Sequence, residues 1–241
     1  MKKIIVIILS LVIITALLSG CVYVRTPGIV IGKGDPVEYE YTVSEYDKIR
    51  IEGYADVRYY ASPSDIVTLK IQPNLVDHCV VEVIGSELVF RMKEDITTSI
   101  TPVLTVSTPT LTRAVFSGAG RFTAYDTIVS DSFSLSVSGA GGGTAELSVK
   151  DLSVNVSGAG GFELSGSADT SKINMSGAGS IDASYLETRE TSIIMTGAGA
   201  VRVNCTETLN IDGAGAGAVE YKGSPRLNLD RSGLITVRQA D

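Results

Sequence analysis

Apolar and polar residues alternate with a period of two over most of the region from residue 111 to residue 241. A short glycine-rich motif, Ser-Gly-Ala-Gly or a close variant, interrupts the alternation at spacings of 21, 19, 19, 20 and 16 residues, and a degenerate copy follows after 18. The motif begins at Ser117, Ser138, Ser157, Ser176, Thr196, Asp212 and Asp230. Period-two alternation is typical of strands with one buried face. Self-similarity near twenty residues is typical of a solenoid.

Apolar columns flank the motif and predict how the coils stack. One residue before each copy stand Phe116, Val137, Val156, Met175, Met195, Ile211 and Leu229, and after it stand Phe122, Phe162, Ile181, Val201, Val219 and Ile235. The second copy fits if Gly142 and Gly143 are an insertion. We therefore predict an all-β fold, a parallel β-helix whose coils each contain a strand, a tight corner, a second strand and a variable return loop.

The corner glycines are expected to be structural, because glycine can adopt positive φ and allows neighbouring coils to approach. They are Gly118, Gly120, Gly139, Gly141, Gly158, Gly160, Gly177, Gly179, Gly197, Gly199, Gly213 and Gly215. The Ser, Thr or Asp that opens the motif is expected to bond the N–H groups of its own turn. Asn155 with Asn174, and Asn210 with Asn228, are expected to stack as amide ladders.

The region 38–110 lacks the repeat but contains short β-rich stretches at 49–53, 55–60, 66–71, 80–84, 88–92 and 103–106. Residues 49–57 have the rhythm of residues 173–181, which suggests a first, irregular coil. The exposed end strands of a solenoid need a cap. We therefore predict one solenoid domain over 38–241, with an irregular capping part at 38–110 and repeat coils at 111–241.

The N-terminus has the pattern of an export signal. Lys2 and Lys3 precede an apolar stretch of fifteen residues, 4–18, which as a helix would reach about 23 Å of a ~30 Å bilayer core. The alternative is a marginal membrane anchor. Residues 18–21, Leu-Ser-Gly-Cys, resemble the lipobox of bacterial lipoproteins, which implies a signal peptide at 1–20 and acyl chains such as palmitate on Cys21. Residues 21–37 would form the lipidated N-terminus and a tether.

Composition and charge exclude several classes of function. The net charge of −7 disfavours a binder of nucleic acid, which needs clustered Lys and Arg against phosphates. One His and three Cys make a metal site or His-based chemistry improbable. The Gly-Ala-Gly turns open strands and lack the phosphate-loop Lys, so no nucleotide is expected. The calcium-binding nonapeptide is also absent. We expect neither a cofactor nor a metal.

One polar column could carry chemistry. Three residues after the turn glycine, and allowing for the insertion, it contains Thr123, Glu146, Glu163, Asp182, Arg202, Glu220 and Thr236. Stacked carboxylates at ~4.8 Å would repel each other unless a cation or basic group neutralises them. Glu146, Glu163 and Asp182 are therefore either a strip that binds a cation or sugar, the paired acids of a polysaccharide-cleaving β-helix, or a solvated face relieved by Arg202. We favour the solvated face.

Three further groups of residues carry thiol, imidazole or aromatic side chains. His78 and Cys79 are adjacent near the start of a strand, so their side chains would point to opposite faces and not form a dyad. Cys79 and Cys205 could pair in an oxidising envelope, although no spacing rule supports it. Tyr54, Tyr59 and Tyr60 could form a sugar-stacking patch, although cross-strand packing is the more common role.

An Ile-x-Ile-x-Gly-x-Ala-x-Val stretch at 49–57, an irregular β region, Pro-Thr-Leu at 109–111 and the twenty-residue recurrence together resemble the auto-transporter adhesin head GIN domain family. The resemblance covers about residues 38–237. It implies an exported, right-handed β-helix-like domain with no assigned catalytic residues.

From these patterns we predict a lipid-anchored protein of the bacterial cell envelope whose solenoid is an interaction surface, adhesin-like or structural, without catalysis. The alternatives are a carbohydrate-active β-helix enzyme or polysaccharide-binding protein, and a partner of another envelope protein. Residues 22 and 23, Val and Tyr, lack the Asp that resembles an inner-membrane retention signal, which favours the outer membrane.

Overall fold

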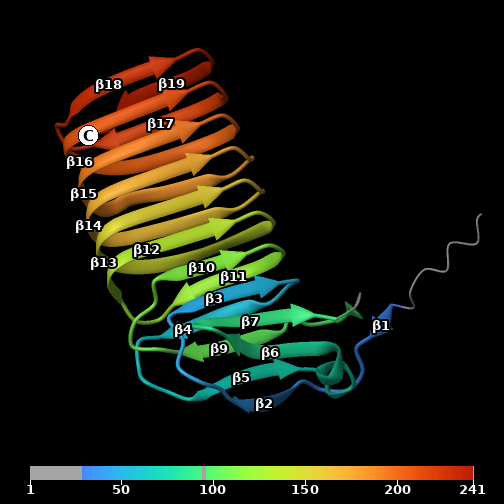
Figure 1. Cartoon of the computed structure of the whole chain (residues 1–241). Helices are drawn as coiled ribbons and strands as arrows, with labels where there is room; N and C mark the ends of the chain where they lie inside the picture. Colours follow the sequence, from blue (N-terminus) through green and yellow to red (C-terminus); the bar gives the residue numbers. More distant parts are fainter. Residues whose placement is uncertain (1–28, 94–95, 241) are drawn as a thin grey trace, which may run out of the picture.

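A computed structural model describes residues 29–93 and 96–240. It confirms the all-β prediction: strands stack as the parallel coils of a solenoid with about seven turns above an irregular N-terminal part (Figure 1). The described elements are β1 (Val30–Ile31), β2 (Val37–Thr42), β3 (Lys48–Glu52), β4 (Asp56–Tyr60), β5 (Ile66–Ile71), the 3₁₀ helix η1 (Pro73–His78), β6 (Cys79–Ile84), β7 (Glu87–Met92), β8 (Ile96–Thr97), β9 (Val103–Ser107), β10 (Arg113–Phe116), β11 (Ala119–Ala124), β12 (Ile128–Val137), β13 (Ala140–Val156), β14 (Gly161–Met175), β15 (Ser180–Met195), β16 (Ala198–Gly213), β17 (Ala216–Lys222), β18 (Arg226–Arg231) and β19 (Leu234–Gln239).

The predicted apolar columns form the core. Val154 pairs in register with Ile173, which pairs with Ile193, and all three are fully buried. After the corner, Phe162 pairs with Ile181 in the same way. Each inward residue thus packs on its equivalents in the coils above and below, which explains the strict period of two.

The predicted return loops are wrong for the central coils. β13, β14, β15 and β16 each run without interruption from one corner to the next, over 15 to 17 residues. In β13, the residues on both sides of the break in the alternation at Lys150 still pair in parallel with the next coil, as in Val149 with Ala168 and Asp151 with Thr170. Because these residues keep their ladder partners, no irregular loop is needed.

Two details of the predicted register are also wrong. Gly142 and Gly143 are not an insertion, because they pair with Gly161 and Phe162. Gly143 therefore occupies an inward position of the phenylalanine column, where a Cβ atom would collide with the backbone of Phe122. In the sixth copy, Gly213 pairs with Met195. The sixth corner therefore lies two residues later in the chain than predicted, at Gly215 and Gly217. Both glycines lie against the carbonyl oxygens of the preceding corner.

The corner glycines are required by close approach rather than by positive φ. Of the twelve predicted corner glycines, only Gly120 has positive φ, at 145°. A Cβ atom on Gly139, Gly158 or Gly177 would lie closer than 3.0 Å to a backbone carbonyl oxygen of the coil below. The hydroxyl of Ser117, which opens the first motif, bonds between coils: its Oγ donates to the carbonyl of Ile51 at 3.2 Å, whereas the prediction was a bond with the N–H groups of its own turn.

The predicted amide ladders are confirmed. Asn174 Nδ2 donates to Asn155 Oδ1 at 2.7 Å, and Asn228 Nδ2 donates to Asn210 Oδ1 at 2.8 Å. The two pairs lie in different columns, because Asn210 pairs with Ser192 and not with Ile194. Each ladder links successive coils on the outer face of the solenoid.

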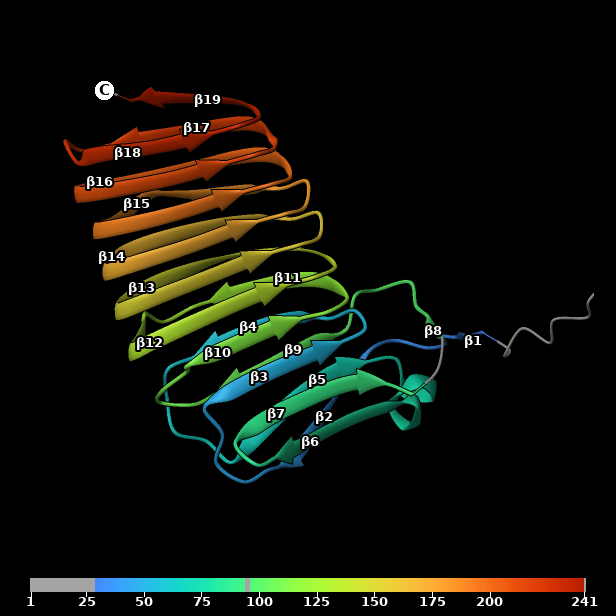
Figure 2. The ribbon, with the colours of Figure 1, turned by 45° about the horizontal axis from the view of Figure 1, so that its top comes forward.

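The N-terminal part continues the stack and then closes it (Figure 2). β3 and β4 pair in parallel with β10 and β11, which confirms residues 49–57 as a first coil. β7 pairs in parallel with β3, and β9 pairs in parallel with β4, which adds one further strand beside each. β6, β5 and β2 then add in antiparallel orientation, which ends the parallel stack.

Part of the predicted tether is built into the fold. Val30 and Ile31 form β1, which pairs in parallel with Ile96 and Thr97 of β8. Asn74 fixes the same segment, because its side chain accepts from the N–H of Lys33 at 2.7 Å and donates to the carbonyl of Ile31 at 2.9 Å. Cys21 and the signal sequence lie outside the described residues.

Candidate functional site

The three predicted acids line one groove on the outer face of the solenoid. This acidic groove has a volume of about 320 Å³. It spans β11 and the first halves of β13, β14 and β15, and its lining comprises Ala124, Thr144, Ala145, Glu146, Glu163, Leu164, Ser165, Asp182 and Tyr185. The acids therefore face a concave surface, which is the arrangement that a bound molecule requires.

The acids do not form the single column predicted. Glu163 pairs with Asp182 on one side and with Thr144 on the other, whereas Glu146 pairs with Ser165. The error follows from the insertion assigned to residues 142 and 143, which displaced Glu146 by two positions. The true column is Thr123, Thr144, Glu163, Asp182, Arg202, Glu220 and Arg238, and Thr236 lies outside it.

Toward the C-terminal end this column becomes a ladder of alternating charge. Arg202 lies 3.2 Å from Asp182 Oδ2 and 3.8 Å from Glu220, and Arg238 bonds Glu220 at 2.5 Å. The relief of Asp182 by Arg202 is therefore confirmed. Burial raises the pKa of Asp182, but hydrogen bonds from Ser184 and the guanidinium of Arg202 outweigh it, and the net pKa is lowered. Asp182 is a fixed anion at the edge of the groove.

An aromatic side chain completes the groove. The Tyr185 side chain is 76 % exposed, and the ammonium of Lys222 lies 4.9 Å from its ring centroid. Tyr185 pairs with Ser165 just after a register shift between β14 and β15, and this irregularity presents the ring to solvent. Sequence reasoning missed Tyr185. The sequence contains one signal of the register shift: the spacing between Ser176 and Thr196 is 20 residues rather than 19.

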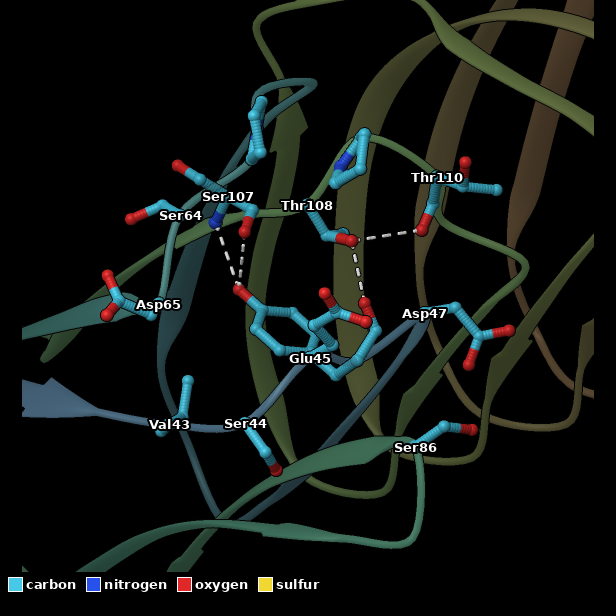
Figure 3. Close-up of a pocket in the computed structure, with 13 residues that line it drawn as sticks. Val43, Ser44, Glu45, Asp47, Ser64, Asp65, Ser86, Ser107, Thr108 and Thr110 are labelled. Atoms are coloured by element: carbon cyan, nitrogen blue, oxygen red, sulfur yellow. Dashed lines mark hydrogen bonds between the residues drawn. The ribbon is translucent and has the colours of Figure 1, made fainter.

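A larger cavity of about 860 Å³ lies where the solenoid meets its cap (Figure 3). The segments that surround it are those between β2 and β3, between β4 and β5, and between β9 and β10, together with Ser86. Sequence reasoning did not identify this cavity, because its lining comes from separate connecting segments with no shared motif.

Hydrogen bonds within the protein occupy much of this cavity's polar lining. The hydroxyl of Tyr46 donates to the carbonyl of Ser107 at 3.1 Å and accepts from its N–H at 3.0 Å. Thr108 Oγ1 donates to the carbonyl of Tyr46 at 2.6 Å, and Thr112 Oγ1 donates to Asp47 Oδ2 at 2.9 Å. Burial raises the pKa of Tyr46 to about 12, so its hydroxyl stays a donor. We assign this cavity to the junction that ties the cap to the solenoid.

The structure separates the three predicted tyrosines. Tyr59 is fully buried and donates to the carbonyl of Thr108 at 3.0 Å. Tyr54 is half-buried and its hydroxyl contacts the carbonyl of Ile96 at 3.4 Å. Tyr60 stacks in parallel on Tyr125, with 5.1 Å between ring centroids. A patch made of all three is therefore wrong, because one ring is part of the core.

The two described cysteines are both buried and free, so the possible pairing of Cys79 with Cys205 is not formed. Cys79 begins β6 in the cap and Cys205 lies in β16, near the other end of the stack (Figure 1). Burial raises the pKa of Cys79 to about 11, which keeps the thiol protonated and unreactive.

Across residues 29–93 and 96–240, no cluster of His, Cys, Asp and Glu has the arrangement of a metal site. The same ranges contain no helix long and apolar enough to cross a membrane.

The family described as "Putative auto-transporter adhesin, head GIN domain" matches residues 45–225, which include the cap except β2, the first six corners and the acidic groove. The chain belongs to this family. The GIN domain assigns it an adhesin-like class of function and a cell-surface or envelope location. No curated protein matches.

Solved structures show the same GIN-domain fold. The chain is similar to a putative adhesin from Bacteroides fragilis NCTC 9343, with a TM-score of 0.80, 24 % identity and coverage of 88 % of this chain and all of that one. It also resembles a putative adhesin from Parabacteroides merdae ATCC 43184, with a TM-score of 0.70, 19 % identity and coverage of 88 % and 99 %. A third relative, from Parabacteroides distasonis ATCC 8503, is described as a putative lipid binding protein, with a TM-score of 0.66, 21 % identity and coverage of 89 % and 100 %.

Proposed function

We propose that this GIN-domain protein is a lipid-anchored adhesin of the cell envelope that binds polysaccharide in the acidic groove without cleaving it. The observation that carries the proposal is the position of the exposed Tyr185 ring at a groove lined by Glu146, Glu163 and Asp182. The face of an aromatic ring packs against the C–H face of a sugar, and carboxylates accept hydrogen bonds from sugar hydroxyls. The lipobox at residues 18–21 supports anchoring at Cys21, with the outer membrane favoured.

The state of Asp182 is unsuited to the general acid of a glycosidase and suited to binding a sugar hydroxyl. A glycosidase requires one carboxyl group that is protonated at the working pH and donates its proton to the leaving oxygen. Asp182 is held ionised by Arg202 and Ser184, so it is suited to accept hydrogen bonds rather than to give a proton.

Removing the ring of Tyr185 tests the proposal. We expect Tyr185→Ala to reduce retention of the protein on immobilised envelope polysaccharides at least tenfold, which corresponds to about 1.4 kcal/mol. Tyr185→Phe, which keeps the ring, should bind like the wild type. Both variants should unfold at the same urea concentration as the wild type, because the side chain is exposed. Equal retention of all three proteins would refute the assignment of this groove.

A further inference from the structure

The C-terminal end of the solenoid leaves its interior partly uncovered. Leu227 and Leu229 of β18 lie in the inward columns of Leu209 and Ile211, which are 0 % and 2 % exposed. With no described strand above them, Leu227 and Leu229 are 37 % and 40 % exposed, and Leu234 at the last corner is 85 % exposed. The N-terminal end is closed by antiparallel strands, whereas among the described residues this end has no cap (Figure 2).

The free edge of β18 also presents hydrogen-bonding groups. The N–H of Ser232 bonds the carbonyl of Gly213, so the backbone groups of Gly213 point toward the last coil. Gly213 pairs with Arg231, and Ile211 pairs with Leu229. Because alternate residues of a strand direct their backbone groups to the same side, those of Leu227, Leu229 and Arg231 point away from the stack. They are available to another strand.

We propose that this edge docks on the same edge of a second copy, by antiparallel pairing of β18 about a two-fold axis at Asn228. The sequence of β18, Arg-Leu-Asn-Leu-Asp-Arg over 226–231, is self-complementary in that register. Arg226 lies opposite Asp230 of the partner, Asn228 lies opposite its own copy, and Leu227 lies opposite Leu229. In the described structure neither Arg226 nor Asp230 has an ion pair, so both charges are free for the partner copy.

The backbone agrees with this register. Leu227 and Leu229 carry the outward-pointing N–H and C=O groups, so their pairs are the hydrogen-bonded ones. Arg226 with Asp230, and Asn228 with its copy, are then the non-hydrogen-bonded pairs, in which Cα atoms approach to about 4.5 Å and side chains are closest. A register shifted by four residues, centred on Asp230, would set two carboxylates against each other. The contact centred on Asn228 is isologous, so the assembly closes at two copies.

The pairing determines how two anchored copies are oriented relative to each other. This step rests on the proposed anchoring at Cys21. The described chain starts at the cap end, and β18 and β19 lie at the opposite end of the stack (Figure 1). A two-fold contact between the far ends places the first described residues of the two copies at opposite ends of the dimer. Two copies joined in this way would therefore link two membranes rather than neighbours in one membrane.

Cysteine cross-linking tests the axis. In the full chain purified in detergent, oxidation of Asn228→Cys is expected to give a disulfide-linked dimer, because residue 228 meets its own copy at disulfide distance. Ser192→Cys is the matched control, since it lies in the same outward column two coils below the edge. A dimer yield for Asn228→Cys no greater than that of Ser192→Cys or the wild type would overturn the proposal.

A charge exchange tests the register independently of disulfide chemistry. Arg226→Asp alone and Asp230→Arg alone should each remain monomeric in sedimentation, because each sets like charges opposite each other. An equimolar mixture of the two variants should restore the dimer, as should the double variant. Monomeric behaviour of the mixture, or of the wild type, would contradict the pairing. A monomeric wild type with normal polysaccharide retention would refute only this inference, whereas a dimeric wild type that is not retained on polysaccharide would refute only the proposed function.

Discussion

Replacing Gly177 by alanine is expected to destabilise the domain by more than about 2 kcal/mol, the range in which a substitution forces a backbone collision. Gly177 does not have positive φ, so the cost comes from contact alone. Its added Cβ atom would lie against the carbonyl of Gly158 in the coil below, and rigid backbone rather than a side chain would have to move. Urea unfolding monitored by circular dichroism measures the difference.

Gly161 provides the matched control. It lies one residue beyond the neighbouring corner, and the nearest atom to its added Cβ would be the Ser180 carbonyl oxygen at 3.9 Å, an ordinary contact. Gly161→Ala should leave stability unchanged or raise it by a few tenths to about 1 kcal/mol, because alanine restricts the unfolded chain. Equal midpoints for Gly177→Ala and Gly161→Ala would show that the coils are not packed as closely as the corner geometry requires.

Replacing Cys21 by serine is expected to abolish lipidation completely. The thiol is the only group of the lipobox that can carry the thioether-linked lipid, and two acyl chains are what make membrane attachment stable. The intact mass of Cys21→Ser should be that of the unprocessed chain. The wild type should be shortened by residues 1–20 and should carry the added mass of acyl chains.

Val22→Ala controls for any change next to the cleavage site and should be processed like the wild type. A wild-type N-terminus that begins with an unmodified Cys21, or one that begins at another residue, would contradict the anchoring. That result would leave the solenoid and its groove unaffected, because both lie outside the signal sequence.

The repeat made most of the fold predictable from sequence. Each inward side chain stacks on the equivalent side chain of the next coil, so apolar residues recur at the same position in every coil. This recurrence predicts where the strands lie and in which order they stack. The register was less predictable where a copy departs from the pattern. Gly143 occupies an inward position without a side chain, which made residues 142 and 143 look like an insertion. Gly213 takes the place of a core methionine, which hid the shift of the sixth corner.

The candidate site was predictable only in part. Glu146, Glu163 and Asp182 share one groove, but their arrangement depends on the register, and a two-residue error moved Glu146 out of line with Glu163. Tyr185 could not be found from the alternation, because a register shift in β15 sets its orientation. The cap cavity arises from connecting segments distant in sequence. Tertiary contacts, such as that of Tyr46 with Ser107, place them together.

The most direct test of a groove that binds without cleaving is a titration of isotope-labelled protein with fragments of a retained polysaccharide, followed by NMR with fragment length measured in the same sample. The account predicts saturable shift changes confined to the acidic groove, at Thr144, Glu146, Glu163 and Tyr185, with fragments of unchanged length. Shift changes confined to the Tyr46 cavity, no shift changes, or shortened fragments would contradict it.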